Sequence, residues 1–540
     1  MLPYLQEVQN PSKKYSVVFR GLNYGEGTQD GEFAETYNIS TDQYPCITQR
    51  AERVKVKDYT TPSIPINKEK HARPTTLHAK GDLLVITEKF AEDGSGIEGE
   101  VFYGDKRLGT VKWGKKQTAT IGNYIVIFPD KMYYKVPTED DKYGEWGMME
   151  KICEYSGLSF TSSSISLSKE DIEKGYKFPF KEGDAVKITG CSKSENNKTA
   201  EIIIRAVADT TLTFDDNAFT AVESEANEVT ISRTVPDLDF ICESNYRLWG
   251  TKGNTIYSSK FSDPFNFQVF DNLASDSYAI EVGSEGEFTG CIPYSSHICF
   301  FKENTLHKLY GTKPSNFQIT TVNVYGVQSG SERSMQIVNE QLLYKGVGGI
   351  YAYTGGVPEL ISEKFGNKRY SEATASCDGE KYYISMKQGD TWNMFTYDVM
   401  KNIWLREDDT HAVDMTFHNG KVYYLDAEGG LYYIDKEADR SDIEWGATFC
   451  TMHETINERK GYSKFHLRMD MAAGAWLAVD IKTDNDLQWQ QVYTTHNEKA
   501  KTVSIPIMPT RCDSIDIRLR GKGKCTIKAF IREFTVGSDV

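Results

Sequence analysis

The sequence predicts an all-β protein, and three observations support this prediction. Short aromatic and β-branched runs recur along the 540 residues, each bounded by Gly, Asn or Asp, as antiparallel strands joined by tight turns are. The runs pair into hairpins at a spacing of roughly forty to fifty residues, which is typical of propeller blades. Near the C-terminus, longer runs alternate strictly between apolar and polar residues, as strands with one solvated face do.

We therefore predict an all-β fold built on a β-propeller of about seven blades. A small SH3-like or OB-like barrel is expected as an insertion, and a β-sandwich is expected at the C-terminus. The predicted segments are an N-terminal extended arm, a first part of the propeller, the inserted barrel, a second part of the propeller and the sandwich. Their ranges are 1–60, 61–144, 145–236, 237–440 and 441–540.

The clearest repeat lies between residues 373 and 435, where one pattern occurs twice. Each copy holds short aromatic runs separated by Gly, Asn or Asp. Four strands per copy and a period of about forty residues indicate a propeller blade. Five further hairpins resemble these two copies. They are 81–86 with 100–103, 122–128 with 131–134, 244–250 with 253–259, 297–301 with 304–310, and 339–344 with 348–353.

The hairpin rhythm stops within residues 145–236, where short strand-like runs follow one another closely and indicate a small barrel inserted in a propeller loop. The first sixty or so residues are rich in Gly, Asn and Asp with weak periodicity, which favours an arm packed over other elements. In the last segment, 465–471 and 514–520 alternate strictly, as the strands of a sandwich do.

Composition and charge exclude several classes of protein. The formal charge is −15 with dispersed acidic residues, which argues against a protein that reads nucleic-acid sequence but permits one past which DNA slides. The ten cysteines include no C-x-x-C pair, so neither a zinc cluster nor a dithiol redox site is predicted. No apolar run approaches the roughly 20 residues of a membrane helix, and no signal peptide is apparent, so we expect folding in a cytosol without membrane insertion.

The strongest catalytic lead lies at Ser385–Trp392 and resembles the sialidase Asp-box, S-x-D-x-G-x-T-W. Ser385, Gly389, Thr391 and Trp392 match the box, but Lys387 replaces its aspartate. The box is a turn-forming element of propeller hairpins, so even a full match indicates fold rather than catalysis. A second pattern, Gly379 with Tyr397 and Trp404, resembles kelch blades, in which the Tyr and Trp pack between blades.

Candidate carboxylates and metal ligands are scattered. Three acidic pairs are candidates for general acid/base groups or calcium ligands, but they fall in turn-like stretches where solvated loop carboxylates are expected. These pairs are Asp140-Asp141, Asp215-Asp216 and Asp408-Asp409. The oxygen-rich run Asp484-Asn485-Asp486 lacks the Gly and distal Glu of an EF-hand loop. We predict no catalytic residue, no metal site and no cofactor, and hence no enzyme.

Three stretches resemble the β-propeller tail proteins of tailed bacteriophages, the hub or nozzle proteins of short-tailed phages and related prophage proteins. One stretch opens the chain, one forms a blade and one ends the chain. Their residues are Asn23, Asp30-Gly31-Glu32, Tyr37-Asn38-Ile39-Ser40, Tyr44-Pro45-Cys46-Ile47 and Arg50; then 245–250, 254–259 and 263–267; then 511–523.

This resemblance implies a structural component of the virion, assembled in the cytoplasm of the bacterial host. Its copies would form a ring in the tail or head–tail region, contact other tail or head–tail connector proteins, and let DNA pass without sequence-specific binding. Two alternatives stay open at this point. One is a glycan-binding or glycan-cleaving propeller that recognises a receptor, and the other is a kelch-like interaction scaffold.

Overall fold

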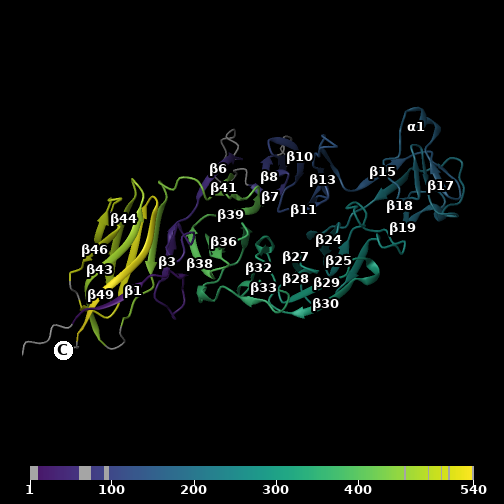
Figure 1. Ribbon diagram of the computed structural model, residues 1–540. Helices are drawn as coiled ribbons and strands as arrows, with labels where there is room; N and C mark the ends of the chain where they lie inside the picture. Colours follow the sequence, from purple (N-terminus) through teal and green to yellow (C-terminus); the bar gives the residue numbers. More distant parts are fainter. Residues whose placement is uncertain are drawn as a thin grey trace, which may run out of the picture. The chain divides into compact units, whose positions relative to one another are not determined.

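The computed structural model describes residues 10–59, 74–90, 97–454, 458–484, 486–499, 501–508 and 511–537 (Figure 1). The predicted all-β class is confirmed: within these ranges strands dominate, and the single α-helix is α1, Lys169–Glu173. The chain forms two compact units, Met1–His71 with Arg333–Val540, and Ala72–Glu332. The predicted boundary between residues 60 and 61 lies outside the described residues, as does Asn485.

Three four-stranded antiparallel sheets of the first unit come from the predicted hairpins. In two of them the strands follow the chain in order, as a meander does. The first of these two meanders consists of β31 (Gln336–Val338), β32 (Gln341–Gly346), β33 (Gly349–Tyr353) and β34 (Glu359–Leu360). The second consists of β35 (Ala373–Cys377), β36 (Lys381–Gln388), β37 (Thr391–Asp398) and β38 (Ile403–Asp408).

The third sheet of the first unit takes its outer strand from the start of the chain. Strands β39 (Ala412–His418), β40 (Lys421–Asp426) and β41 (Gly430–Asp435) pair in order, and β6 (Glu52–Asp58) then pairs with β41. Asn419 and Gly420, at the turn between β39 and β40, have φ values of 47° and 78°, which suit the tight hairpin turns that favour Asn-Gly. The sheet is therefore completed by residues that the sequence pattern had assigned to the arm.

The second unit holds four more antiparallel meanders. They are β7 (Pro74–Lys80), β8 (Asp82–Phe90), β9 (Ile97–Tyr103) and β10 (Lys106–Lys112); β11 (Gln117–Ile121), β12 (Tyr124–Phe128), β13 (Met132–Lys135) and β14 (Glu145–Met148); β23 (Phe240–Ser244), β24 (Arg247–Lys252), β25 (Thr255–Ser258) and β26 (Tyr278–Glu281); and β27 (Phe288–Tyr294), β28 (His297–Lys302), β29 (Thr305–Tyr310) and β30 (Gln318–Asn323).

Within each unit, the first strands of successive sheets pack against one another. In the second unit β11 contacts both β7 and β23, and β23 contacts β27. In the first unit β35 contacts both β31 and β39. Each sheet therefore presents its first strand to the next sheet, and the apolar side chains between neighbouring sheets form shared clusters.

The segment between β14 and β23 forms two further sheets around a core of its own. One sheet has the order β15 (Lys151–Tyr155), β22 (Val229–Arg233), β18 (Ala185–Thr189), β19 (Lys198–Ile203), and the other β16 (Ser159–Phe160), β17 (Ser164–Ser166), β21 (Thr211–Thr213), β20 (Ala206–Ala208). Val186, Leu212 and Ile231 are fully buried in this core. The chain enters this segment on β15 and leaves it on β22, and these two strands pair with each other.

The C-terminal strands form two sheets that take up N-terminal strands (Figure 1). One sheet has the order β1 (Ser12–Ser16), β49 (Cys525–Gly537), β43 (Arg459–Met471), β46 (Thr502–Pro506), with β47 (Arg511–Cys512) on β43. The other has the order β2 (Gly21–Leu22), β3 (Glu32–Tyr37), β42 (Glu444–Phe449), β48 (Ile515–Lys522), β44 (Trp476–Thr483), β45 (Gln490–Thr495). The strands β4 (Ile39–Ser40) and β5 (Thr48–Gln49) form a separate pair.

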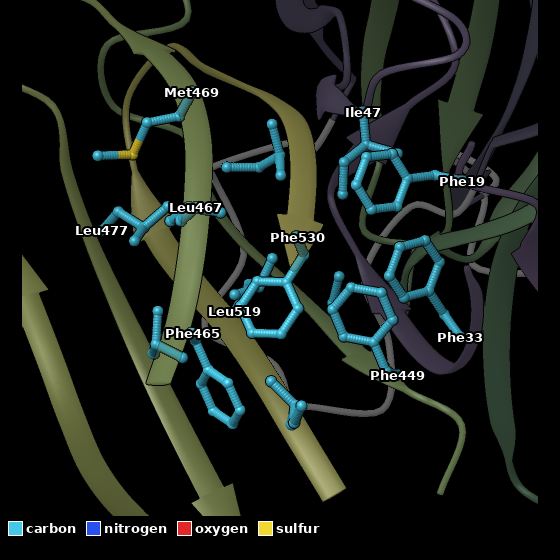
Figure 2. Packing of buried hydrophobic residues seen from close by; sticks show 14 of the residues in the cluster. Phe19, Phe33, Ile47, Phe449, Phe465, Leu467, Met469, Leu477, Leu519 and Phe530 are labelled. Carbon is cyan, nitrogen blue, oxygen red and sulfur yellow. The ribbon is translucent and has the colours of Figure 1, made fainter. Parts of the chain in front are cut away.

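Aromatic side chains from both ends of the chain meet in the core between these two sheets (Figure 2). The ring of Phe449 lies 4.9 Å from that of Phe33 and 5.6 Å from that of Phe530, measured between centroids. Phe530 in turn lies 5.2 Å from Phe465. Offset and tilted pairs at these distances are favourable. The N-terminal residues are therefore part of this core rather than only a covering arm.

Candidate functional sites

The structure gives the residues that resemble an Asp-box a packing role. Ser385 Oγ donates a hydrogen bond to the Thr410 carbonyl (2.8 Å) and accepts one from the Ala412 amide (3.2 Å). Trp392 stacks on His411, with 3.7 Å between ring centroids and 9° between planes. These contacts hold the β36–β37 hairpin against the start of the next sheet.

The kelch-like pair also packs between sheets, as the resemblance implies. The rings of Tyr397 and Trp404 stack at 4.5 Å, and Trp404 Nε1 donates a hydrogen bond to the Ile361 carbonyl (2.8 Å), which follows β34. Phe365 packs edge-on against Trp404 at 5.0 Å. All three rings belong to the cluster that joins the sheet beginning with β31 to the sheet beginning with β35.

The two acidic pairs of the second unit lie in separate connections, Asp140-Asp141 after β13 and Asp215-Asp216 after β21. Asp141 pairs with Lys135 (2.6 Å) in a half-exposed position, and Asp215 pairs with Arg205 (2.9 Å) in an exposed one. Asp484 accepts the backbone amides of Asp513 (2.7 Å) and Ser514 (3.0 Å). Throughout the described ranges, no group of three or more His, Cys, Asp or Glu side chains is placed to hold a metal ion.

Asp408 is an exception, and the interpretation of its carboxylate as solvated is wrong. Its Oδ2 lies 2.6 Å from Nη1 of the buried Arg53, while Glu407 Oε2 lies 2.6 Å from Nη2 of the same guanidinium. Burial acts to raise the pKa of Asp408, but the charge of Arg53 and a hydrogen bond from Thr410 outweigh it and hold the pKa below its ordinary value. The carboxylate thus fastens β6 to the end of β38.

This difference predicts unequal effects of Asp→Asn substitutions on the free energy of unfolding. Asp408→Asn should cost about 1–3 kcal/mol, because it weakens a charge-assisted pair with a buried guanidinium. Asp390→Asn, at an exposed turn, should stay within about 0.5 kcal/mol. Urea unfolding of both variants and of the parent protein measures the two changes in the free energy of unfolding. Equal changes would show that the ion pair between Asp408 and Arg53 does not fasten β6 to β38.

A second buried ion cluster fastens the N-terminal strands to the last strand, β49. The Arg532 side chain is fully buried, and its Nε lies 2.6 Å from Glu454 Oε1. Its Nη2 lies 2.6 Å from Asp30 Oδ1 and its Nη1 lies 2.6 Å from Ser16 Oγ, at the end of β1. One guanidinium therefore joins three segments that are far apart in the sequence.

A third cluster fastens the segment between β14 and β23 to the loop after β25. Asp184 accepts hydrogen bonds from Arg233 Nη1 and from Asn266 Nδ2, both at 2.9 Å. Asn266 Oδ1 accepts the amide of Ala185 (3.1 Å), and the Arg233 guanidinium lies over the ring of Phe265. Phe265 and Asn266 belong to the 263–267 stretch that the sequence analysis singled out, but this contact was not predicted from it.

Two cavities were not indicated by the sequence. One, of about 310 Å³, lies in the second unit and is lined by aromatic and hydroxyl side chains, among them Trp249, Ser296 and Phe317, together with Arg247. The Arg247 guanidinium donates hydrogen bonds to the carbonyls of Ser259, Ala274 and Asp276. The other cavity, of about 240 Å³, lies in the first unit and is lined by the cationic residues Lys345, Lys368 and Arg369.

No helix in the ranges that the structure describes is long and apolar enough to cross a membrane.

Comparison with known proteins gives no family and no function. No family model matches the sequence, and no curated protein matches it. Among solved structures, BamB from Moraxella catarrhalis is similar over 72% of this chain and 98% of its own, with 11% identity and a TM-score of 0.33. An acylaminoacyl peptidase from Pyrococcus horikoshii is similar over 72% of this chain and 59% of its own, with 10% identity and a TM-score of 0.34. At these scores neither likeness carries a functional conclusion.

Proposed function

We propose that this protein is a structural virion component of a tailed bacteriophage or prophage. Its copies form a ring in the tail or head–tail region, as a hub or nozzle, and DNA passes through the ring. The observation that carries this proposal is the use of buried charge. The buried ion clusters around Arg53, Arg233 and Arg532 join segments that are distant in the sequence. Such cross-links suit a subunit that has to stay folded under mechanical load.

The fold proposed for this subunit is a propeller of seven blades. Seven four-stranded antiparallel sheets lie outside the insertion in the described part of the chain, and each is either a meander or a three-stranded meander completed by β6. In each unit, the first strand of a sheet contacts the first strand of the next sheet, as the inner strands of propeller blades are expected to do. Completion of the last sheet by an N-terminal strand resembles the way in which propellers close.

Two arguments support the proposed ring, one from the dimensions of a propeller and one from charge. The central channel of one propeller is lined by side chains and is too narrow for a DNA duplex, so only a ring of subunits leaves room. A net charge of −15 per subunit favours passage without adhesion, because an acidic lining repels the phosphate backbone. A heterologous contact repeated around a closed ring supplies the assembly.

The inserted segment and the C-terminal sandwich are the proposed contact surfaces, because apolar faces of the four-stranded sheets are buried against neighbouring sheets. Other tail or head–tail connector proteins are the proposed partners at the two ends of the ring. A glycan-binding propeller is the second candidate, favoured by the cavity that Trp249, Ser296 and Phe317 line. A glycan array separates the two, since only the second predicts specific retention of an oligosaccharide.

Electron microscopy of the purified virion tests the ring. We expect rotationally symmetric density for this chain at the tail or head–tail junction, with the DNA path along the symmetry axis. A monomer in solution is compatible with this result, because a neighbouring virion protein can template the ring. Absence of the chain from the particle, or its presence only as single copies on fibres, would contradict the proposal.

A further inference from the structure

The cavity of about 240 Å³ in the first unit is bordered by the β32–β33 turn and by the connection between β34 and β35. Gly348 and Gly349 supply the turn, and Ser362 supplies a hydroxyl. Ser362 Oγ accepts the amide of Ile350 (2.8 Å), so its own proton is left to donate elsewhere. The lining is thus partly polar, and Ile350, Phe365 and Met386 supply apolar side chains to it.

Three cationic side chains line this cavity. Lys345 is only 2% exposed, and its ammonium donates to the Gly346 carbonyl (2.5 Å). The ammonium of Lys368 lies 3.1 Å from the ring centroid of Tyr24. Arg369 Nη1 donates to the carbonyls of Gly366 (3.0 Å) and Lys368 (3.2 Å). Among the described lining residues, Glu363 supplies the one carboxylate against these three cations.

Burial and neighbouring cations lower the pKa values of two of these side chains. Burial, and then the charge of Arg369, lowers the pKa of Lys345 to about 8. Burial, and then the charge of Arg406, lowers the pKa of Lys368, while Glu35 acts in the opposite direction. Positive charge is therefore concentrated in this cavity although the chain as a whole is acidic, and a bound anion would relieve the repulsion.

We propose that this cavity binds the phosphate group of a small molecule. Lys345 and Arg369 supply cationic donors, the Ser362 hydroxyl supplies a neutral one, and the apolar side chains accommodate the group that carries the phosphate. A phosphate carries close to two negative charges at neutral pH, which balances several cations better than a single carboxylate does. The planar guanidinium of Arg369 also suits the oxygen spacing of a phosphate.

Equilibrium dialysis with inorganic phosphate at pH 7 tests the site on the full-length protein. We expect one phosphate per chain, and weaker retention of acetate. Lys345→Met and Arg369→Gln should each weaken binding by about tenfold or more, since each removes a charged donor. Lys387→Gln is the matched control, because Lys387 lies on β36 next to the lining residue Met386 but pairs with Glu372 instead. Its affinity for phosphate should equal that of the parent protein.

Thermal unfolding supplies a readout that does not depend on dialysis. Phosphate should raise the Tm of the parent protein and of Lys387→Gln. Phosphate should no longer raise the Tm of Lys345→Met, because this variant lacks the buried ammonium of the site. Tighter binding of glycerol 3-phosphate than of phosphate would identify a phosphate ester as the ligand, and the reverse order would identify the free ion. Equal phosphate binding by Lys345→Met and the parent, or tighter binding of acetate, would overturn the proposal.

Discussion

Replacing Arg532 by Met is expected to lower the free energy of unfolding by about 3–5 kcal/mol, which is the cost of removing one partner of a buried ion pair. The substitution leaves Glu454, whose side chain is 1% exposed, without the guanidinium that lies 2.6 Å away. It also removes the hydrogen bond to Ser16 and the ion pair with Asp30, so β1 keeps its backbone pairing with β49 but loses these side-chain contacts. Urea unfolding monitored by circular dichroism measures the loss.

A double-mutant cycle separates the contribution of the ion pair between Arg532 and Glu454 from the effect of losing side-chain volume at position 532. In Arg532→Met the buried carboxylate of Glu454 keeps the half-exposed Lys14 as an ion-pair partner, 2.9 Å from its Oε2, but loses the buried guanidinium. Glu454→Gln removes the charge of this carboxylate, so the double variant should be more stable than Arg532→Met alone. Lys522→Met is the control from the same sandwich. Lys522 pairs with Asp442, which is 90% exposed, and its loss should change stability by less than about 0.5 kcal/mol. An Arg532→Met variant as stable as this control would show that the buried cluster does not hold the N-terminal strands.

The hairpins were predictable from the sequence because their information is local. The turn at Asn419-Gly420 needs positive φ at both residues, and the flanking runs alternate with the period of a strand. The same holds for the meander over β35 to β38, where each strand pairs with its neighbour in the chain. Strand identity and pairing therefore follow from sequence alone wherever partners are adjacent in the chain.

The role of residues 10–59 was not predictable in the same way. Strand β2 has only two residues and shows no period, and β6 pairs with β41, which follows it far along the chain. The burial of Asp408 depends on Arg53, which is 355 residues away. An acidic pair in a turn-like stretch looks solvated when its partner is that remote, so the error arose from a missing tertiary contact.

The cationic cavity escaped prediction for a related reason. Lys345 directly follows the run Leu342-Leu343-Tyr344, and a lysine at this place in a strand pattern is ordinarily read as an exposed residue. Because β32 is covered on both faces, that residue is buried. A lysine within a strand whose other residues are apolar is the signal available in sequence, but its neighbours Lys368 and Arg369 arrive from a connection without periodicity.

Trp404→Ala is expected to cost about 3–5 kcal/mol of unfolding free energy, as truncation of a core aromatic does. The indole is 1% exposed and fills the space between two sheets, where it stacks on Tyr397 at 4.5 Å. Truncation also leaves the Ile361 carbonyl without the indole donor at 2.8 Å. Because the two sheets share this cluster, we expect their separation to be the first event on heating, measured as a lower Tm and earlier hydrogen exchange in β34.

Trp392→Ala is the matched comparison, since Trp392 lies on β37 of the same sheet as Trp404 but packs on one side only, against His411. Loss of this half-buried stacked pair should cost about 1 kcal/mol. The decisive quantity is the ratio between the losses of unfolding free energy in the two variants, because it compares an aromatic side chain between two sheets with one at a hairpin. If Trp392→Ala proved as costly as Trp404→Ala, the junction between the two sheets would not be where the first unit draws its stability.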